Sequence, residues 1–343
     1  MTTLDASPDA GPPGSLGRAP LVRVDGVRRH FGEVEALAGL SFEVPENSIT
    51  VLLGPNGAGK TTAIRMITGA LKPDSGSVRV FGLDPDVEGE EVRRRCGVVS
   101  AKPALYDRLS GYDNLAYSAE LYGLGRGAKV GDRIRAAAHR FGIEHALDSH
   151  VGGFSTGMKT RLALARSILH DPELLLFDEP TSGLDPESSH AVLEMIREMT
   201  DDGRTVLMCT HLLMEAEGLA EQIIVLEDGD DIVSGTPVEL TRRFWPHAVV
   251  RLAAEDPTSL DAAKDVPGVR SYVPGDPAVV QLDDERRIAD LVAALTASGV
   301  RLTRVEPLQP TLEDLYFAVR TRGDMSEDGG RQLVPTAARA FMS

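Results

Sequence analysis

The sequence predicts an α/β protein with a mostly parallel sheet, followed by a small α+β module. Over residues 21–240 short β-rich runs alternate with helical patterns, and this alternation favours parallel strands. One of these runs, residues 48–53, enters a glycine-rich turn that opens a helical pattern. A second series of runs fills residues 246–320 in the order βαββαβ, which is typical of a ferredoxin-like module.

The elements of the first part follow from β-rich runs and from apolar positions at helical spacing. Strands are expected at residues 21–24, 40–44, 48–53, 77–80, 97–99, 173–177, 205–208, 223–226 and 231–234. Helices are expected at residues 60–70, 156–169 and 187–200. Residues 111–150 show helical spacing without strong strand signals, so a helical subdomain is expected at about residues 105–165.

The second part has a pattern of its own. Its strands are expected at residues 248–252, 269–273, 279–282 and 301–305, and its helices at 259–264, 285–297 and 311–319. The last helix carries Leu312, Leu315 and Tyr316 on one face, which is expected to pack on its own module. Residues 1–20 are rich in Gly, Pro and Ala and residues 321–343 are rich in Gly, so we expect a disordered leader and tail.

Composition limits the kind of partner. The chain has 343 residues, of which 52 are acidic and 36 are basic, giving a formal net charge of -16. A field of this sign repels nucleic acid, so no nucleic-acid partner is expected. No apolar run approaches the roughly 18 residues of a membrane span, so the chain is expected in the cytoplasm. Cys96 and Cys209 fall in apolar strands, where a free thiol packs as a small hydrophobe.

The glycine-rich turn is a candidate phosphate site. The segment GPNGAGKTT fits G-x-x-x-x-G-K-[ST] and lies between a strand and a helix, which is the context that this motif requires. Its glycines let backbone amides converge on phosphates at the positive end of the helix. Lys60 would contact the outer phosphates, and the Thr61 hydroxyl would bind Mg²⁺. The candidate set is Gly54, Pro55, Asn56, Gly57, Ala58, Gly59, Lys60, Thr61 and Thr62.

Two acidic residues follow the apolar run LLLF. A lone DE pair is more often the exposed end of a core strand, but the phosphate motif supplies it with partners. Asp178 would hold Mg²⁺ together with Thr61, and Glu179 would act as the general base for the attacking water. His211 ends the next strand. Because ligands of open α/β sheets collect at the carboxyl ends of strands, it would contact the transferring phosphoryl group.

Five segments resemble the nucleotide-binding subunits of ABC transporters in sequence, order and spacing: GPNGAGKTT, FSTGM, LLLFDEP, SGLD and TH. The resemblance implies a P-loop NTPase fold with an antiparallel β subdomain and a helical subdomain. It implies ATP and Mg²⁺ as cofactors, and a head-to-tail dimer of two copies around two ATP molecules. Ser155, Thr156 and Gly157 of the signature segment would bind ATP held by the opposite copy. Asp185 would cross the dimer interface, and Phe31 would stack on adenine.

One position departs from that family. Its members commonly read GVVPQEPALY where this chain reads GVVSAKPALY, which places Ala101 at the usual Gln. Alanine has no polar side chain to contact Mg²⁺ or the attacking water, and the resemblance implies that this Gln also links the nucleotide to the membrane subunit. We therefore expect hydrolysis through Glu179 and His211 that is slower or differently gated. Lys102 is expected to be a solvated surface lysine.

The C-terminal part suggests a subgroup. It ends in PTLEDLYFAV and resembles the tail of exporter ATPases that work with ABC-2 type permeases. The resemblance implies an ATPase that drives export of a drug, an antibiotic or a lipid-like compound, held on the inner face of the cell membrane through its permease. Two alternatives stay open. One is a non-transport ABC ATPase of translation or DNA repair, and the other is an ATP-binding regulator whose hydrolysis is weakened by Ala101.

Overall fold

The computed structural model describes residues 19–323. The chain divides between Thr236 and Pro237 into two compact units. The division falls before the predicted boundary at residue 240, because helix α8 (Pro237–Phe244) groups with the second unit. The predicted disordered leader and tail lie largely outside the described residues. Within the described range, no helix is both long and apolar enough to cross a membrane.

A six-stranded sheet forms the centre of the first unit, in the order β5-β6-β7-β3-β8-β9. The strands are β3 Ile49–Leu53, β5 Cys96–Val99, β6 Leu174–Asp178, β7 Thr205–Thr210, β8 Gln222–Glu227 and β9 Asp230–Gly235. All neighbouring pairs are parallel except β8 and β9. Strands β3, β6 and β7 are buried along their whole length, as their apolar runs predict. The turns that follow these three strands at their carboxyl ends are therefore anchored by buried, closely packed strands.

A separate three-stranded antiparallel sheet has the order β2-β1-β4. Its strands are β1 Pro20–Phe31, β2 Val34–Pro45 and β4 Ser75–Val80. Strands β1 and β2 are each 12 residues long and extend well beyond the predicted runs at 21–24 and 40–44. Several irregularities in register between them break the alternation of buried and exposed side chains, and this hid their full length in the sequence.

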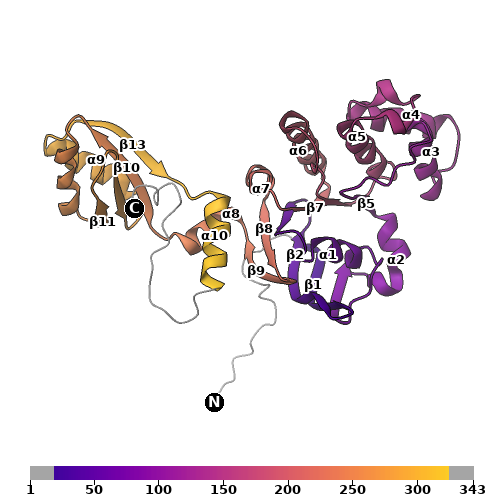
Figure 1. The fold of residues 1–343 in the computed structure, drawn as a ribbon, viewed down its shortest axis with the longest axis horizontal. Coiled ribbons are helices and arrows are strands. Elements are labelled where there is room, and N and C mark those ends of the chain that lie inside the picture. The colour runs from indigo at the N-terminus through magenta and orange to yellow at the C-terminus, as the bar shows by residue number, and fades with distance from the viewer. Residues whose placement is uncertain (1–18, 324–343) are drawn as a thin grey trace, which may run out of the picture. The chain divides into compact units, whose positions relative to one another are not determined.

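The helices of the first unit are α1 Lys60–Ile67, α2 Pro85–Arg94, α3 Gly111–Leu121, α4 Ala128–Arg140, α5 Thr156–Ser167, α6 Pro186–Asp201 and α7 Leu213–Leu219. Helices α3, α4 and α5 pack on one another and form the helical group seen in Figure 1. Helices α2 and α7 were not predicted. For α2 the sequence carries a usable signal, since Asp84 accepts a hydrogen bond from the Asp86 amide and Pro85 begins the helix.

The second unit contains a four-stranded sheet in the order β11-β12-β10-β13. Its elements are β10 Ala248–Ala254, η3 Pro257–Asp265, β11 Val269–Val273, β12 Ala278–Leu282, α9 Arg287–Ala297, β13 Leu302–Leu308 and α10 Leu312–Gly323. Neighbouring strands are antiparallel, as in a split βαββαβ arrangement. The segment predicted as a first α-helix is a 3₁₀ helix. Leu312 and Leu315 are buried, and α10 packs against α8.

Candidate active site

The candidate phosphate turn joins β3 to α1. A Cβ on Gly54 would lie 2.4 Å from the carbonyl oxygen of Leu226, so a larger residue does not fit there. Gly59 has a φ of 104°, and a Cβ there would lie 2.6 Å from Leu37 Cδ2. Both the backbone conformation and the space therefore require glycine at this position. The turn leads directly into the N-terminal end of α1, where the helix dipole favours anions.

Lys60 is the first residue of α1 and only 6% of its side chain is exposed. Its ammonium group donates to the carbonyl oxygens of Gly54, at 2.6 Å, and Pro55, at 3.1 Å. The same nitrogen lies 3.2 Å from Glu179 Oε1. A buried charge requires partners of this kind. The sequence did not reveal that the phosphate lysine is paired with the predicted general base.

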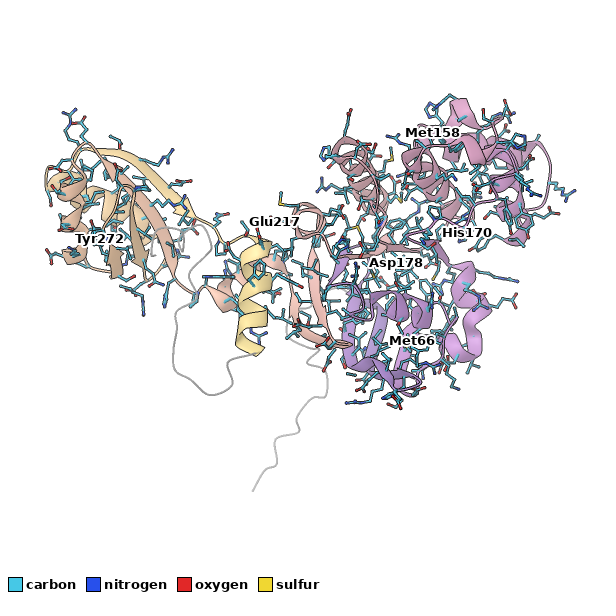
Figure 2. All side chains as sticks on the ribbon, in the orientation of Figure 1. Met66, Met158, His170, Asp178, Glu217 and Tyr272 are labelled. Atoms are coloured by element: carbon cyan, nitrogen blue, oxygen red, sulfur yellow. The ribbon has the colours of Figure 1, made fainter. Side chains whose placement is uncertain are left out.

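Thr61 and Asp178 meet at the carboxyl end of β6. The Thr61 hydroxyl donates to Asp178 Oδ2 at 2.7 Å, and Figure 2 shows Asp178 near the middle of the first unit. Burial raises the pKa of the Asp178 carboxyl, although the hydrogen bond from Thr61 opposes this shift. A hydroxyl beside a carboxylate fits Mg²⁺, which takes one or two protein oxygens and otherwise binds phosphate and water.

Glu179 follows Asp178 with a φ of 51°, in the left-handed region. This conformation is uncommon for a residue with a side chain and occurs preferentially at functional sites. Glu179 Oε2 lies 2.7 Å from His211 Nδ1. This distance is that of a hydrogen bond between the imidazole ring and the carboxylate. His211 therefore orients Glu179. The contact of His211 with the transferring phosphoryl group stays a prediction.

The signature segment and the SGLD segment form a second group of candidate residues. Ser155 is exposed and caps α5, where its hydroxyl accepts from the Met158 amide at 3.2 Å. Asp185 is exposed and caps α6, where it accepts from the Ser188 amide at 2.9 Å. The two segments are neighbours, since a Cβ on Gly157 would lie 3.9 Å from Leu184 Cδ2.

Thr156 begins α5 and its side chain is exposed beside the SGLD segment. A Cβ on Gly183 would lie 3.9 Å from Thr156 Cγ2. The contacts described for Ser155 and Asp185 satisfy only their own helix ends. This group therefore leaves an exposed surface that carries helix N-termini.

Phe31 is the last residue of β1, and 46% of it is exposed. The guanidinium carbon of Arg29 lies 5.1 Å from the centre of the Phe31 ring. This is within the range of a cation–π contact. An exposed aromatic ring at a hairpin end fits the predicted role of stacking on a base, and that role stays a prediction.

Comparison with known proteins decides the family. The model of the ABC transporter family matches residues 37–182. The daunorubicin/doxorubicin resistance ATP-binding protein DrrA of Streptomyces peucetius is 34% identical over 304 residues, which are 87% of this chain and 92% of that protein. The chain belongs to the ABC transporter ATP-binding proteins. Nod factor export ATP-binding protein I of Ralstonia nicotianae is 36% identical over 246 residues, which are 71% of this chain and 76% of that protein.

A solved structure agrees with membership in the ABC transporter family. An ATP-binding subunit of an ABC transporter superposes with a TM-score of 0.60 at 31% identity, covering 65% of this chain and 93% of that one. The predicted resemblance and fold class are confirmed. This ABC protein is therefore an ATPase, and its nucleotide is ATP.

The segment in which Ala101 replaces the usual Gln lies just after β5 in this ABC ATPase. Ala101 is exposed just after β5, and Lys102 is exposed as expected. Ser100 lines a cavity of about 270 Å³ together with Thr61 and Asp178. The Ser100 hydroxyl donates to the carbonyl oxygen of Lys102 at 2.8 Å. The polar side chain that this segment brings to the cavity is thus serine, one residue before the expected Gln.

Sequence reasoning missed two supports of the ABC site. The Thr210 hydroxyl donates to Glu215 Oε2 at 3.0 Å and accepts from the Leu212 amide at 3.0 Å, which holds the backbone on both sides of His211. Arg166 of α5 donates to the carbonyl oxygen of Ala104, and so joins the signature helix to the segment after β5. Arg166 and Ala104 lie 62 positions apart, so no local pattern marks their contact. The contacts of Thr210 are local, and a Thr hydroxyl that accepts from the amide two residues later is a turn signal that could have found them.

Proposed function

We propose that this chain is the ATP-hydrolysing subunit of an ABC exporter, with the roles predicted for its site residues. The observation that carries the proposal is the position of the Glu179 carboxylate. One of its oxygens lies 3.2 Å from the Lys60 ammonium and the other lies 2.7 Å from His211 Nδ1. A carboxylate held from both sides beside a phosphate-binding turn suits a general base that acts on water.

In the proposed reaction Glu179 accepts a proton from water while the water oxygen attacks the γ-phosphorus of ATP. The bond from that phosphorus to its bridging oxygen breaks, and the electron pair leaves with ADP. Lys60 would exchange its contact with Glu179 Oε1 for the outer phosphates, which leaves Oε1 able to accept the proton. Thr61 and Asp178 would hold Mg²⁺, which neutralises charge on the phosphate oxygens. His211 keeps the carboxylate in place through its other oxygen.

The proposed active unit is a head-to-tail dimer that encloses two ATP molecules. Ser155, Thr156 and Gly157 would contact ATP held on the Lys60 side of the opposite copy, and Asp185 would cross the interface. The support is that Ser155 and Asp185 are exposed at the starts of α5 and α6, where helix dipoles favour an anion.

The proposed partner in the membrane is an ABC-2 type permease, and the proposed cargo is a drug, an antibiotic or a lipid-like compound. The support lies in the names of relatives: one is a drug resistance protein and another serves Nod factor export. The chain would then sit on the cytoplasmic face of the cell membrane through that permease. Export proteins among its relatives and the acidic net charge of -16 favour this function over a role in translation or DNA repair.

Ala101 favours one second candidate, an ATP-binding regulator with weak hydrolysis. The two candidates differ in turnover, so phosphate release by the purified chain with Mg²⁺-ATP separates them. We expect turnover that falls by about 100-fold or more in Glu179→Gln, as for loss of a general base. No Glu179-dependent phosphate release would favour the regulator. Copurification of the tagged chain with a polytopic membrane protein tests the transport assignment. Absence of the tagged chain from membranes that contain the permease candidate would contradict that assignment.

A further inference from the structure

Asp74 joins the loop after α1 to the end of β1 through both its side chain and its backbone. Its Oδ1 accepts from the Arg29 guanidinium at 2.7 Å, and its Oδ2 accepts from the His30 amide at 2.7 Å. Its own amide donates to the carbonyl oxygen of Arg28 at 2.9 Å. The hydrogen bond from the His30 amide, helped by Arg29, lowers the pKa of the Asp74 carboxyl. One side chain therefore holds both the backbone and the cation that precede Phe31.

Arg29 is held in a fixed position by more than one acceptor. Besides Asp74, the guanidinium donates to the carbonyl oxygen of Lys72 at 3.1 Å. Its carbon lies 5.1 Å from the centre of the Phe31 ring, which still has 46% of its surface exposed. A cation at this distance is attracted to the face of the ring, and this attraction favours the ring orientation that faces the cation. Phe31 is thus presented as an oriented platform with open surface.

The platform is connected to the phosphate turn through β2. Arg29 pairs with Leu37 across the β1–β2 ladder, and Phe31 pairs with Val34. A Cβ on Gly59 would lie 2.6 Å from Leu37 Cδ2, so β2 lies directly against the turn. Phe31 is two residues beyond Arg29, or about 7 Å along the strand. A nucleotide with its phosphates on the turn can therefore reach the ring with its base.

We propose that Asp74 is a positioning residue for the nucleobase, acting through Arg29 and His30 to set the Phe31 ring against adenine. The inference rests on the proposed roles of Phe31 and of the phosphate turn. Its ligand is the purine base of the nucleotide, and its effect is on base affinity rather than on phosphate affinity. Asn at position 74 replaces one of the two acceptor oxygens by an NH2 donor, so it cannot accept at both of the positions that the guanidinium and the amide now use.

The test compares binding of ADP and of inorganic pyrophosphate to the full chain by calorimetry. Neither ligand is hydrolysed by an ATPase, and only ADP carries the base. We expect Asp74→Asn to weaken ADP about fivefold and to change pyrophosphate affinity by less than about twofold, because stacking and its cation partner are what the variant loosens. In a Phe31→Ala background the same Asp74→Asn change should leave ADP affinity unaltered.

Glu43→Gln is the matched control, because Glu43 pairs with Arg23 at 2.8 Å in the same sheet. It should leave both affinities unchanged. Equal weakening of ADP and pyrophosphate by Asp74→Asn would overturn the inference, as would an equal loss in the Phe31→Ala background. Failure of the proposed function has different signatures. If the turn did not bind phosphate, the unmodified chain would bind neither ligand, and if only hydrolysis failed, both ligands would bind but no Glu179-dependent phosphate release would be measured.

Discussion

Two regions of the molecule differ in how many contacts their candidate residues make with one another. The first region is the site around Lys60, and the second is the surface around Ser155 and Asp185. In the first region Thr61 contacts Asp178 at 2.7 Å. Glu179 contacts both Lys60, at 3.2 Å, and His211, at 2.7 Å. In contrast, Ser155 and Asp185 make their described hydrogen bonds only within the first turns of α5 and α6. The two regions carry motifs of the same family, yet only in the first do the candidate residues contact one another in pairs inside one chain.

This difference supports a division of each ATP site into two half-sites, of which one is the first region and the other is the second region. A general base and a metal carboxylate must be placed accurately, and the residues proposed for these roles, Glu179 and Asp178, lie at the end of a buried strand. An anion-binding helix end needs only to be exposed with its amide groups facing the anion. It can therefore complete a site on another molecule. In a symmetric dimer each composite site would then combine the first region of one copy with the second region of the other.

Mixing two inactive variants tests this division most strongly. Ser155→Arg should block the surface that serves the partner, and Glu179→Gln should remove the base of its own site. Each alone should lose about 100-fold or more of phosphate release. Mixed together, they should form some dimers in which one composite site has both intact halves, and recover about a quarter of normal activity for random pairing into two-fold dimers.

The control for the mixing experiment uses two variants of the first region. Lys60→Ala and Glu179→Gln damage the same half-site, so every composite site in their mixture stays defective. Recovery in this control, or no recovery with Ser155→Arg and Glu179→Gln, would contradict the two-half-site arrangement. Phosphate release at equal total protein is the measurement in both cases.

Ala101→Gln sharpens the description of the first region. The segment after β5 brings Ser100 to the cavity beside Thr61 and Asp178, while Ala101 has no polar side chain. Installing Gln should change the ATPase rate or its Mg²⁺ dependence by about threefold to tenfold, within the range of one added polar contact. An identical rate and an identical Mg²⁺ titration would show that position 101 has no part in hydrolysis. Lys102→Gln, one residue on, is the control.

The two regions should also respond to substitution with opposite changes in stability. Burial holds the pKa of Asp178 above its ordinary value. The folded pKa therefore exceeds the unfolded one, and any stability tied to the protonated form is lost as pH rises through the folded value. At pH 7 the buried carboxylate destabilises the fold, so Asp178→Asn should gain about 1 kcal/mol, or roughly 2–4 °C in Tm.

The matched substitution in the second region removes a helix cap. Ser155→Ala deletes the acceptor of the Met158 amide and should lose about 1 kcal/mol. Thermal unfolding without nucleotide at pH 7 and at pH 4 measures both variants. The gain of Asp178→Asn should shrink at the lower pH, where the native carboxyl takes up a proton, and the loss of Ser155→Ala should not. A lower Tm for Asp178→Asn at pH 7 would contradict the argument.

The motifs predicted where the candidate residues lie in the fold, because these motifs depend on local backbone geometry. The glycines of GPNGAGKTT predict a turn, and the structure shows why Gly54 and Gly59 have no room for a side chain. The strand ends at Asp178 and His211 were expected at one edge of the sheet. Helices α2 and α7 and the full lengths of β1 and β2 were missed, because their sequences are short, charged or interrupted by irregular register.

The sequence by itself determined which residues are candidates for the chemistry, because glycine turns, helix caps and apolar strands each leave a local pattern. Only the tertiary structure decided how those residues pair. The 3.2 Å contact of Lys60 with Glu179, the hydrogen bond of His211 to that carboxylate and the hold of Asp74 on Arg29 join segments far apart in the chain. Such contacts depend on strand order and register, which long-range packing sets and no local pattern records.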